Sequence, residues 1–174
     1  MQEPLSVPVV SVCIPTYNGA EFLEECLISV VSQQEIEIEI ILLDDHSSDR
    51  TVEIAQSMAQ RFPRHRWLVR KNPVRLGMAA NWNACVDLAR GEFVKLVGQD
   101  DVLREDCLVR QVAALRSHPS ATVAASSRVM INRNGQRMFR MPSPYPTGLI
   151  PGAEAAHQCL LSGTNLVGDP VAVL

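Results

Sequence analysis

The chain has 174 residues, of which 47% are hydrophobic and 20% are charged, and its formal net charge is -3. This length suits one domain with a substantial core, and the ordinary composition and weak charge exclude an intrinsically disordered chain and a surface for nucleic acid. No stretch reaches the ~18 apolar residues of a membrane span, and the N-terminus lacks the basic region of a secretory signal.

Strand and helix patterns alternate along the chain. Short apolar or β-branched runs predict strands, and apolar residues that recur at helical spacing predict amphipathic helices. In chain order these are strand 9–14, helix 20–31, strand 37–43, helix 49–62, strand 67–69, helix 78–89, strand 93–97, helix 104–117, strand 122–126 and helix 154–161. Strands that alternate with single helices predict right-handed crossovers and a mostly parallel sheet.

A few residues are expected to set the ends of these elements. Pro15 should end the first strand, because proline has no N–H for a sheet ladder. Ser48 is expected to be the N-cap of the second helix, and Gly91 the C-terminal glycine of the third. The Asn-Gly pair at 134–135 is typical of a hairpin turn and predicts an antiparallel pair of strands there.

Two adjacent carboxylates, Asp100 and Asp101, follow the strand expected at 93–97. Side-by-side carboxylates repel each other unless a cation or a proton offsets their charge. One interpretation is a divalent-metal site, with Mg²⁺ or Mn²⁺ held by one or two carboxylates and completed by substrate phosphates. The other is that both residues cap the helix expected from residue 104. This stretch alone leaves both interpretations open.

Three loops stand at the carboxyl ends of expected strands, at residues 16–18, 44–49 and 98–101. In open α/β sheets ligands bind at such ends, so the three loops predict one crevice. The sequence has neither G-x-G-x-x-G after the first strand nor G-x-x-x-x-G-K-[ST], which disfavours dinucleotide and P-loop sites. A nucleotide could still bind if a carboxylate accepts an N–H of the base, an aromatic ring stacks on the base and a metal neutralises the diphosphate.

The chain resembles the family 2 glycosyltransferases of the GT-A fold, from about residue 9 to residue 173. The residues that carry the resemblance are Ser-Val-Cys-Ile-Pro-Thr-Tyr-Asn at 11–18, Ile-Leu-Leu-Asp-Asp-His-Ser-Ser-Asp at 41–49, and Gly-Glu-Phe at 91–93 leading to Gln-Asp-Asp at 99–101. The resemblance implies an α/β, Rossmann-like fold with a mostly parallel central sheet flanked by helices and a small antiparallel element near the C-terminal part. It implies a single nucleotide-sugar-binding domain over residues 1–174, incomplete at its C-terminus.

The resemblance also assigns site residues. It places the donor nucleotide among Thr16, Tyr17, Asn18, Asp45, Arg75, Gln99 and Asp100, and the metal on Asp100 and Asp101. In this assignment Thr16 and Tyr17 are walls of the nucleoside pocket, and Asp45 accepts an N–H of the base. Gln99 contacts the ribose, and Asp101 assists or orients the carboxylate that binds the metal.

Three positions leave parts of this assignment open. The family usually carries an acid two positions before Asp100, where this chain has Gly98, so metal binding would depend more on the phosphates of the nucleotide. Arg75 either reaches a phosphate or is a solvated loop cation. In the family the general base is usually an acid in a motif that would follow residue 174. Asp169 is the late acid of this chain and so the candidate base, although an acid before a proline also suits a turn.

The implied reaction is inverting, metal-assisted transfer of a sugar from a UDP-, GDP- or dTDP-sugar to the hydroxyl of a carbohydrate or lipid-linked acceptor. The resemblance thus implies a role in polysaccharide or cell-envelope biosynthesis. The alternative is a catalytically incomplete nucleotide-sugar-binding or scaffold domain of the same fold. A receiver-type phosphoacceptor domain needs a late lysine, and no lysine follows Lys95.

Five widely spaced cysteines form no C-x-x-C pair. They are typical of small buried hydrophobic side chains in a reducing compartment rather than of a disulfide or zinc framework. The sequence therefore predicts a cytoplasmic location, with peripheral attachment to the inner face of the membrane as a variant of it.

Overall fold

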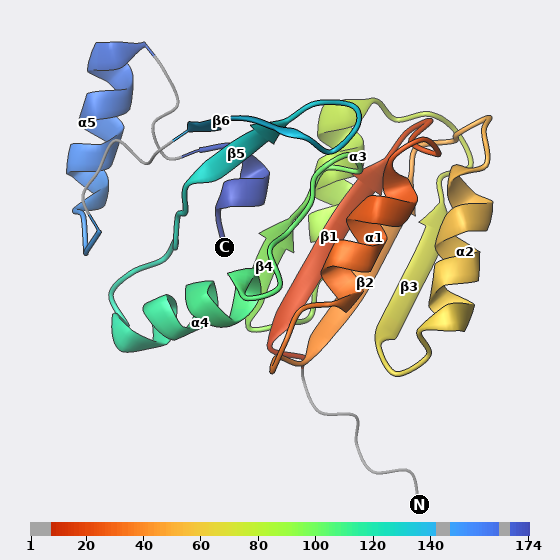
Figure 1. The fold of residues 1–174 in the computed structure, drawn as a ribbon, viewed down its shortest axis with the longest axis horizontal. Helices are drawn as coiled ribbons and strands as arrows, with labels where there is room; N and C mark the ends of the chain where they lie inside the picture. The colour runs from red at the N-terminus through yellow and green to blue at the C-terminus, as the bar shows by residue number, and fades with distance from the viewer. Residues whose placement is uncertain (1–7, 142–146, 164–167) are drawn as a thin grey trace, which may run out of the picture. The chain divides into compact units, whose positions relative to one another are not determined.

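The computed structural model describes residues 8–141, 147–163 and 168–174, and the chain forms two compact units, Met1–Arg110 and Gln111–Leu174. The first contains β1 (Val10–Thr16), α1 (Leu23–Val31), β2 (Ile38–Asp44), α2 (Thr51–Arg61), β3 (Arg66–Lys71), α3 (Met78–Val86), β4 (Phe93–Leu96) and the start of α4 (Cys107–Ser117) (Figure 1). The second contains the rest of α4, β5 (Arg128–Ile131), β6 (Arg137–Met141), α5 (Gly152–Ser162) and a 3-10 turn (Pro170–Ala172). The expectation of a single domain over residues 1–174 stays a prediction.

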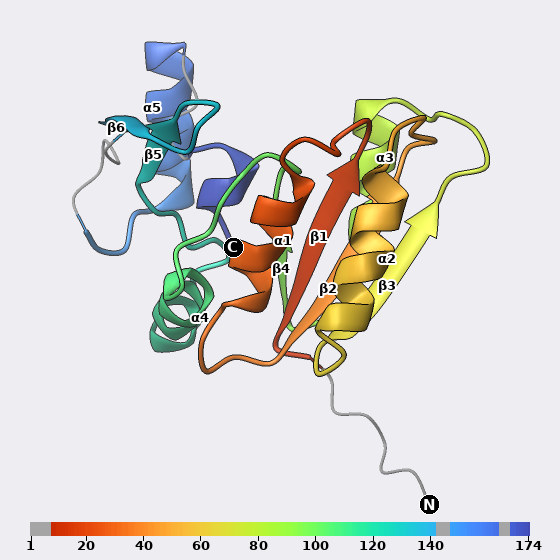
Figure 2. The same cartoon turned by 45° about the vertical axis from the view of Figure 1, so that its right-hand side comes forward.

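The first unit is built on a parallel sheet with strand order β3-β2-β1-β4. Helices α1 and α2 lie on one face of this sheet and α3 on the other (Figures 1 and 2). The strand order runs outward from β1 in one direction to β3 and then returns to the other side of β1 with β4. The topological switch point therefore lies between β1 and β4, where an open α/β sheet binds its ligand.

The core of the first unit surrounds β1 and β2, whose residues are all buried. Cys13, Ile41 and Leu43 face α3 and form a buried cluster with Cys85. On the other face, α1 buries an apolar stripe at helical spacing, which consists of Leu23, Cys26, Leu27, Val30 and Val31. Burial on both faces explains why these strands are mostly apolar, with Ser11 and Glu39 as buried polar residues among the apolar ones.

The first strand continues through Pro15 to Thr16, so the expectation that Pro15 ends it is wrong. The carbonyl of Cys13 accepts the N–H of Val97, so the backbone N–H and C=O groups of odd-numbered residues in β1 point toward β4. Pairing between these two strands ends at Cys13 and Leu96. Pro15 lies beyond that end, so its missing N–H removes no bond from the described sheet.

Two expected helix ends are also wrong. The second helix begins at Thr51, and Asp49 Oδ1 accepts the Thr51 N–H at 3.1 Å, so Ser48 is not the N-cap. The third helix ends at Val86, so Gly91 is not its C-terminal glycine. A Cβ at Gly91 would lie 2.7 Å from the Ser11 nitrogen. Glycine is therefore needed there for a close approach to β1 rather than for a helix end.

The strand expected at 93–97 is confirmed as β4, whereas the one expected at 122–126 is not formed. The strand at 93–97 is an edge strand in the described sheet, and within β4 only Lys95 is buried. Residues 122–126 form no strand, because their pairing is one isolated bridge between Ala125 and Val173. Ala124 and Leu174 exchange two backbone hydrogen bonds of 2.9 and 3.0 Å beside it.

The second unit contains the expected antiparallel pair. β5 and β6 form a two-stranded sheet, and Gly135 in the connecting turn has a φ of 72°. Only glycine adopts that conformation at no steric cost, which explains the Asn-Gly signal. The helix expected at 154–161 is confirmed as α5. Within the described ranges, no helix is both long and apolar enough to cross a membrane.

Candidate functional site

The loops that follow β1 and β2 are joined side by side at the carboxyl edge of the sheet. The Asn18 N–H donates to Ser47 Oγ at 2.8 Å, and Asn18 Oδ1 accepts the Ser48 N–H at 3.0 Å. Below them, the buried Asp44 carboxylate accepts the Ser47 N–H at 2.8 Å and the Thr16 hydroxyl at 3.2 Å. Thr16 is buried at the end of β1, so its hydroxyl serves this network. These contacts fix the first two loops before any ligand binds.

Gln99 joins the loop after β4 to the loop after β1. Its side-chain Oε1 accepts the Tyr17 N–H at 2.9 Å, and its Nε2 donates to the Tyr17 carbonyl at 3.1 Å. A Cβ at Gly19 would lie only 2.2 Å from Gln99 Oε1, so the glycine leaves room for this amide. The sequence does not indicate this role, because the two residues pair only through the adjacency of β1 and β4.

Asp45 is buried, with 2% of its surface exposed, and it holds the loop between β3 and α3. Its Oδ1 accepts the Leu76 N–H at 2.7 Å and Asn72 Nδ2 at 3.1 Å, while Oδ2 accepts the Gly77 N–H at 2.8 Å. Burial alone would raise the pKa of Asp45, but these hydrogen bonds and the nearby Arg75 charge outweigh it and lower that pKa. Asp45 is therefore a charged acceptor at neutral pH.

Two asparagines that the sequence interpretation missed support Asp45 from behind. Asn72 Nδ2 also donates to Asn81 Oδ1 at 2.9 Å, and Asn81 Nδ2 donates to the Leu43 carbonyl at 3.0 Å. Both asparagines are buried. No local sequence pattern marks these two asparagines, and both have hydrogen-bond partners, as buried polar groups generally do.

Arg75 lies over the ring of Tyr17, with its guanidinium carbon 4.0 Å from the ring centroid. The two residues come from loops 58 positions apart in sequence, and both are exposed. A cation over an aromatic face is attracted by the ring quadrupole. The structure thus brings Arg75, Tyr17 and Asp45 together on one side of the candidate site.

Asp100 and Asp101 lie in the loop after β4. The Asp101 Oδ2 accepts the Gly98 N–H at 3.1 Å, and the Asp101 N–H donates to the Gly98 carbonyl at 3.1 Å. Asp100 is exposed. The following helix begins only at Cys107, so the interpretation of both acids as its caps is wrong. A Cβ at Gly98 would meet Asp101 Oδ2, the far end of a flexible side chain, at 2.6 Å.

The described residues contain no group of three or more His, Cys, Asp or Glu side chains placed to hold a metal ion. Asp100 and Asp101 instead offer two adjacent carboxylates. Mg²⁺ and Mn²⁺ are commonly held by one or two carboxylates, with substrate phosphates and water completing the shell. The donor set therefore fits a metal that arrives with a diphosphate.

Asp169 belongs to the second unit and forms an ion pair there. Its Oδ2 lies 2.8 Å from Nε of Arg128, whose side chain is 20% exposed. This partner explains why an acid stands before Pro170, since the pair fastens the C-terminal turn to β5. A catalytic role for Asp169 stays a prediction.

Comparison with known proteins places these features in a family. The profile described as glycosyl transferase family 2 matches residues 11–166. A protein of Mycobacterium tuberculosis, the uncharacterized protein MT1568, is 33% identical over 174 residues, which cover 96% of this chain and 53% of that protein. The chain therefore spans about half the length of this relative.

Two solved structures are similar to the chain. The mannosyltransferase PcManGT from Pyrobaculum calidifontis, in complex with GDP-Man and Mn²⁺, has a TM-score of 0.64 and 27% identity over 71% of this chain and 36% of that one. The S. aureus protein TarS, in complex with UDP, has a TM-score of 0.60 and 29% identity over 66% and 33% of the two chains. These likenesses confirm the expected α/β GT-A fold.

Proposed function

Because this chain belongs to glycosyl transferase family 2, we propose that it forms the donor-binding part of an enzyme that moves a sugar from a nucleotide-sugar to an acceptor hydroxyl with inversion. The observation that carries the proposal is the hydrogen-bonded convergence of the loops after β1, β2 and β4 at the switch point of the sheet. The carboxyl ends of the strands at a switch point are where open α/β sheets bind ligands. The nucleotide and Mn²⁺ complexes of the similar structures support the proposal.

We propose that Asp45 reads a single N–H of the base. A carboxylate has about four acceptor positions, and Asp45 already accepts from Leu76, Gly77 and Asn72. The remaining position suits uracil or thymine, each of which presents one N–H on its pairing edge. Guanine presents two adjacent donors there, so we expect UDP- or dTDP-sugars to be preferred over GDP-sugars.

The other donor contacts follow from the same loops. The exposed ring of Tyr17 offers a stacking surface beside Thr16 and Asn18, and Arg75 supplies a cation for a phosphate. An amide side chain has two donor hydrogens and two acceptor lone pairs. Gln99 uses one donor and one acceptor on the Tyr17 backbone, so it keeps capacity for a ribose hydroxyl.

Asp100 is proposed as the main metal ligand, with Asp101 in support. A Mg²⁺ or Mn²⁺ ion bound there would supply positive charge to the departing diphosphate. Asp100 is exposed and Asp101 is oriented by the Gly98 N–H, so the first carboxylate is the better placed to meet a diphosphate.

Asp169 is the proposed general base within this chain. Such a group typically contributes ~10²–10⁴-fold to the rate. The competing interpretation is that Asp169 only fastens the C-terminal turn through Arg128. In the full-length protein, Asp169→Asn would lower kcat if Asp169 is the base. A loss of stability with normal kcat would assign it to the turn.

Calorimetry with UDP, GDP and dTDP, each with and without Mn²⁺, tests the nucleotide site. We expect binding of UDP or dTDP that Mn²⁺ strengthens. The full-length protein should transfer or hydrolyse the matching nucleotide-sugar, and Asp100→Ala should abolish this activity. Nucleotide binding without turnover against any acceptor would instead support the scaffold alternative.

No disulfide joins the five cysteines, all of which lie within the described residues. Cys13, Cys26 and Cys85 are buried, as suits small hydrophobic side chains, and we infer that the chain acts in the cytoplasm. A lipid-linked acceptor would bring it to the inner face of the membrane. Cell fractionation distinguishes the two locations: a peripheral protein is found with the membrane fraction and is released by a salt wash, whereas a protein without membrane attachment is found in the supernatant.

A further inference from the structure

Cys26 and Ser29 of α1, and Gln33 just beyond its end, form a row of hydrogen-bonding side chains that face one segment. They are spaced by three and four residues, so they point to the same side. All three are buried. The segment they contact is the one that carries Asp100 and Asp101.

The first two members of this row hold the acidic loop at both of its ends. The Cys26 thiol donates to the Gly98 carbonyl at 3.4 Å. Ser29 Oγ accepts the Leu103 N–H at 3.0 Å and donates to the Cys26 carbonyl at 2.7 Å. Asp100 and Asp101 lie between these two points. Their backbone is therefore fixed from both sides by α1.

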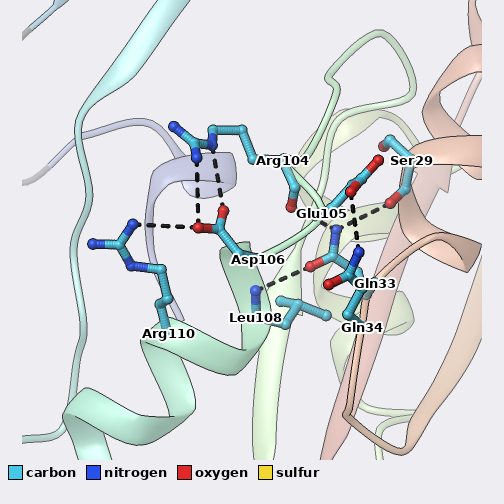
Figure 3. A network of polar contacts seen from close by, with 8 residues as sticks. All are labelled: Ser29, Gln33, Gln34, Arg104, Glu105, Asp106, Leu108 and Arg110. Atoms are coloured by element: carbon cyan, nitrogen blue, oxygen red, sulfur yellow. Dashed lines mark hydrogen bonds and ion pairs between the residues drawn. The ribbon is translucent and has the colours of Figure 1, made fainter.

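Gln33 uses both ends of its amide on the segment that follows (Figure 3). Its Nε2 donates to the Arg104 carbonyl at 2.8 Å and to the Ser29 carbonyl at 3.0 Å, and its Oε1 accepts the Leu108 N–H at 3.0 Å. Leu108 lies in the first turn of α4, where backbone N–H groups have no partner within the helix. Gln33 therefore caps α4 from α1.

The ion pairs on the outside of this segment are weaker constraints. Asp106 lies 3.3 Å from Arg104 Nε and 3.3 Å from Arg110 Nη1, as Figure 3 shows. The three side chains are 39 to 79% exposed. Exposed pairs of this kind contribute little, because solvent screens them. The buried row on α1 is what sets the course of the chain from Gly98 to Leu108.

We propose that Ser29 and Gln33 are positioning residues for the two acids, so that the metal-dependent part of nucleotide binding depends on a row of contacts reaching across from α1. This inference rests on the proposed function, because it assigns the acids to a metal. It adds that the base-binding side of the candidate site, held by Asp45 and the β3–α3 loop, does not depend on the same contacts.

The test compares UDP binding by calorimetry with and without Mn²⁺ in the complete protein, using dTDP or GDP if the wild type prefers it. Gln33→Met keeps the volume but loses the hydrogen bonds. We expect it to lower the Mn²⁺ enhancement of affinity by ~10-fold or more, the usual cost of losing a residue that orients a ligand. Metal-free affinity should stay within ~2-fold of the wild type, because the base side is untouched.

Two variants separate positioning from general destabilisation. Ser29→Ala should lower the same enhancement, and it tests the inference if Gln33→Met does not fold. Val30→Ala removes core volume on the same helix without removing any of the side-chain hydrogen bonds to this segment, and it should leave the enhancement unchanged.

Each outcome separates the two proposals. If wild-type binding is strengthened by Mn²⁺ and neither Gln33→Met nor Ser29→Ala alters that strengthening, the inference is overturned and the proposed function stands. An equal loss in Val30→Ala, or an equal loss of metal-free binding, also overturns the inference. If the wild type binds none of the three nucleotides under either condition, the proposed function fails and the inference fails with it.

Discussion

Replacing Asp45 by asparagine tests whether its charge holds the loop between β3 and α3. The variant keeps the shape of the side chain but turns one oxygen into a donor. Each oxygen of Asp45 accepts at least one N–H, from Leu76 and Asn72 on one side and from Gly77 on the other. In either orientation of the new amide, its NH₂ group therefore faces an N–H donor where a carboxylate oxygen had accepted a hydrogen bond.

The magnitude follows from these contacts. A hydrogen bond to a charged group contributes about 1.5–3 kcal/mol and a neutral one about 1 kcal/mol. The better orientation of the amide loses the bond to Gly77 and weakens the two that remain. Asp45→Asn should therefore lower the free energy of unfolding by about 3 kcal/mol. Guanidinium unfolding at pH 7 measures this, and exposed Asp87→Asn is the control that should change little.

The pH dependence provides the second half of the test. The pKa of Asp45 is lowered in the folded chain, so its contribution is fully present above the unfolded pKa, ~3.9, and is lost as the pH falls through the folded value. The gap between wild type and Asp45→Asn should stay constant above about pH 5 and narrow in acid. Hydrogen exchange at Leu76 and Gly77 should accelerate in the variant. A gap below ~1 kcal/mol at pH 7 would refute the reasoning.

Three further changes test other contacts of the first unit. Gly98→Asp places a Cβ 2.6 Å from Asp101 Oδ2, an atom that can rotate away, so we expect the variant to fold. The added carboxylate should make Mn²⁺ bind more tightly, as measured by calorimetry. Weaker Mn²⁺ binding would contradict this. Arg75→Ala removes the cation over Tyr17 and should cost about 0.5–1 kcal/mol of unfolding free energy, less in Arg75→Lys, whereas no change would show that the stack is not stabilising. Burial lowers the pKa of Lys95 to about 8 in the folded chain, below the unfolded value of ~10.4. The free energy of unfolding of the wild type should therefore rise relative to that of Lys95→Met by roughly 3 kcal/mol between pH 8 and ~10.4. A constant difference across that range would argue against a buried charge.

Elements with a continuous or periodic apolar pattern could be predicted from the sequence. The strands at 10–16 and 38–44 are fully buried, and the apolar spacing of α1 matches its buried stripe. Local signals were less reliable where tertiary context decided the outcome. Pro15 sits inside a central strand because its neighbour β4 is short, and no property of residues 9–16 indicates the length of β4.

The three loops of the candidate site were predicted to meet, and the sheet order brings them to one edge. The support behind them could not be read from the sequence. Asn72 and Asn81 meet Asp45 and Leu43 only because β2, β3 and α3 are in a particular register. Polar residues of this kind have no local pattern, whereas apolar positions repeat with the period of their element.

The same side chains that are expected to contact the nucleotide also hold the loops together. The Gln99 amide pairs with the Tyr17 backbone, and Asp45 anchors Leu76 and Gly77. This pre-assembly lowers the ordering cost of binding. It also means that truncating either side chain removes a ligand contact and loosens the loop at once. The two losses can be separated by comparing the complete nucleotide with an analogue that lacks the contacted group. Loosening of the loop weakens the binding of both compounds, whereas loss of the contact weakens the binding of the complete nucleotide alone.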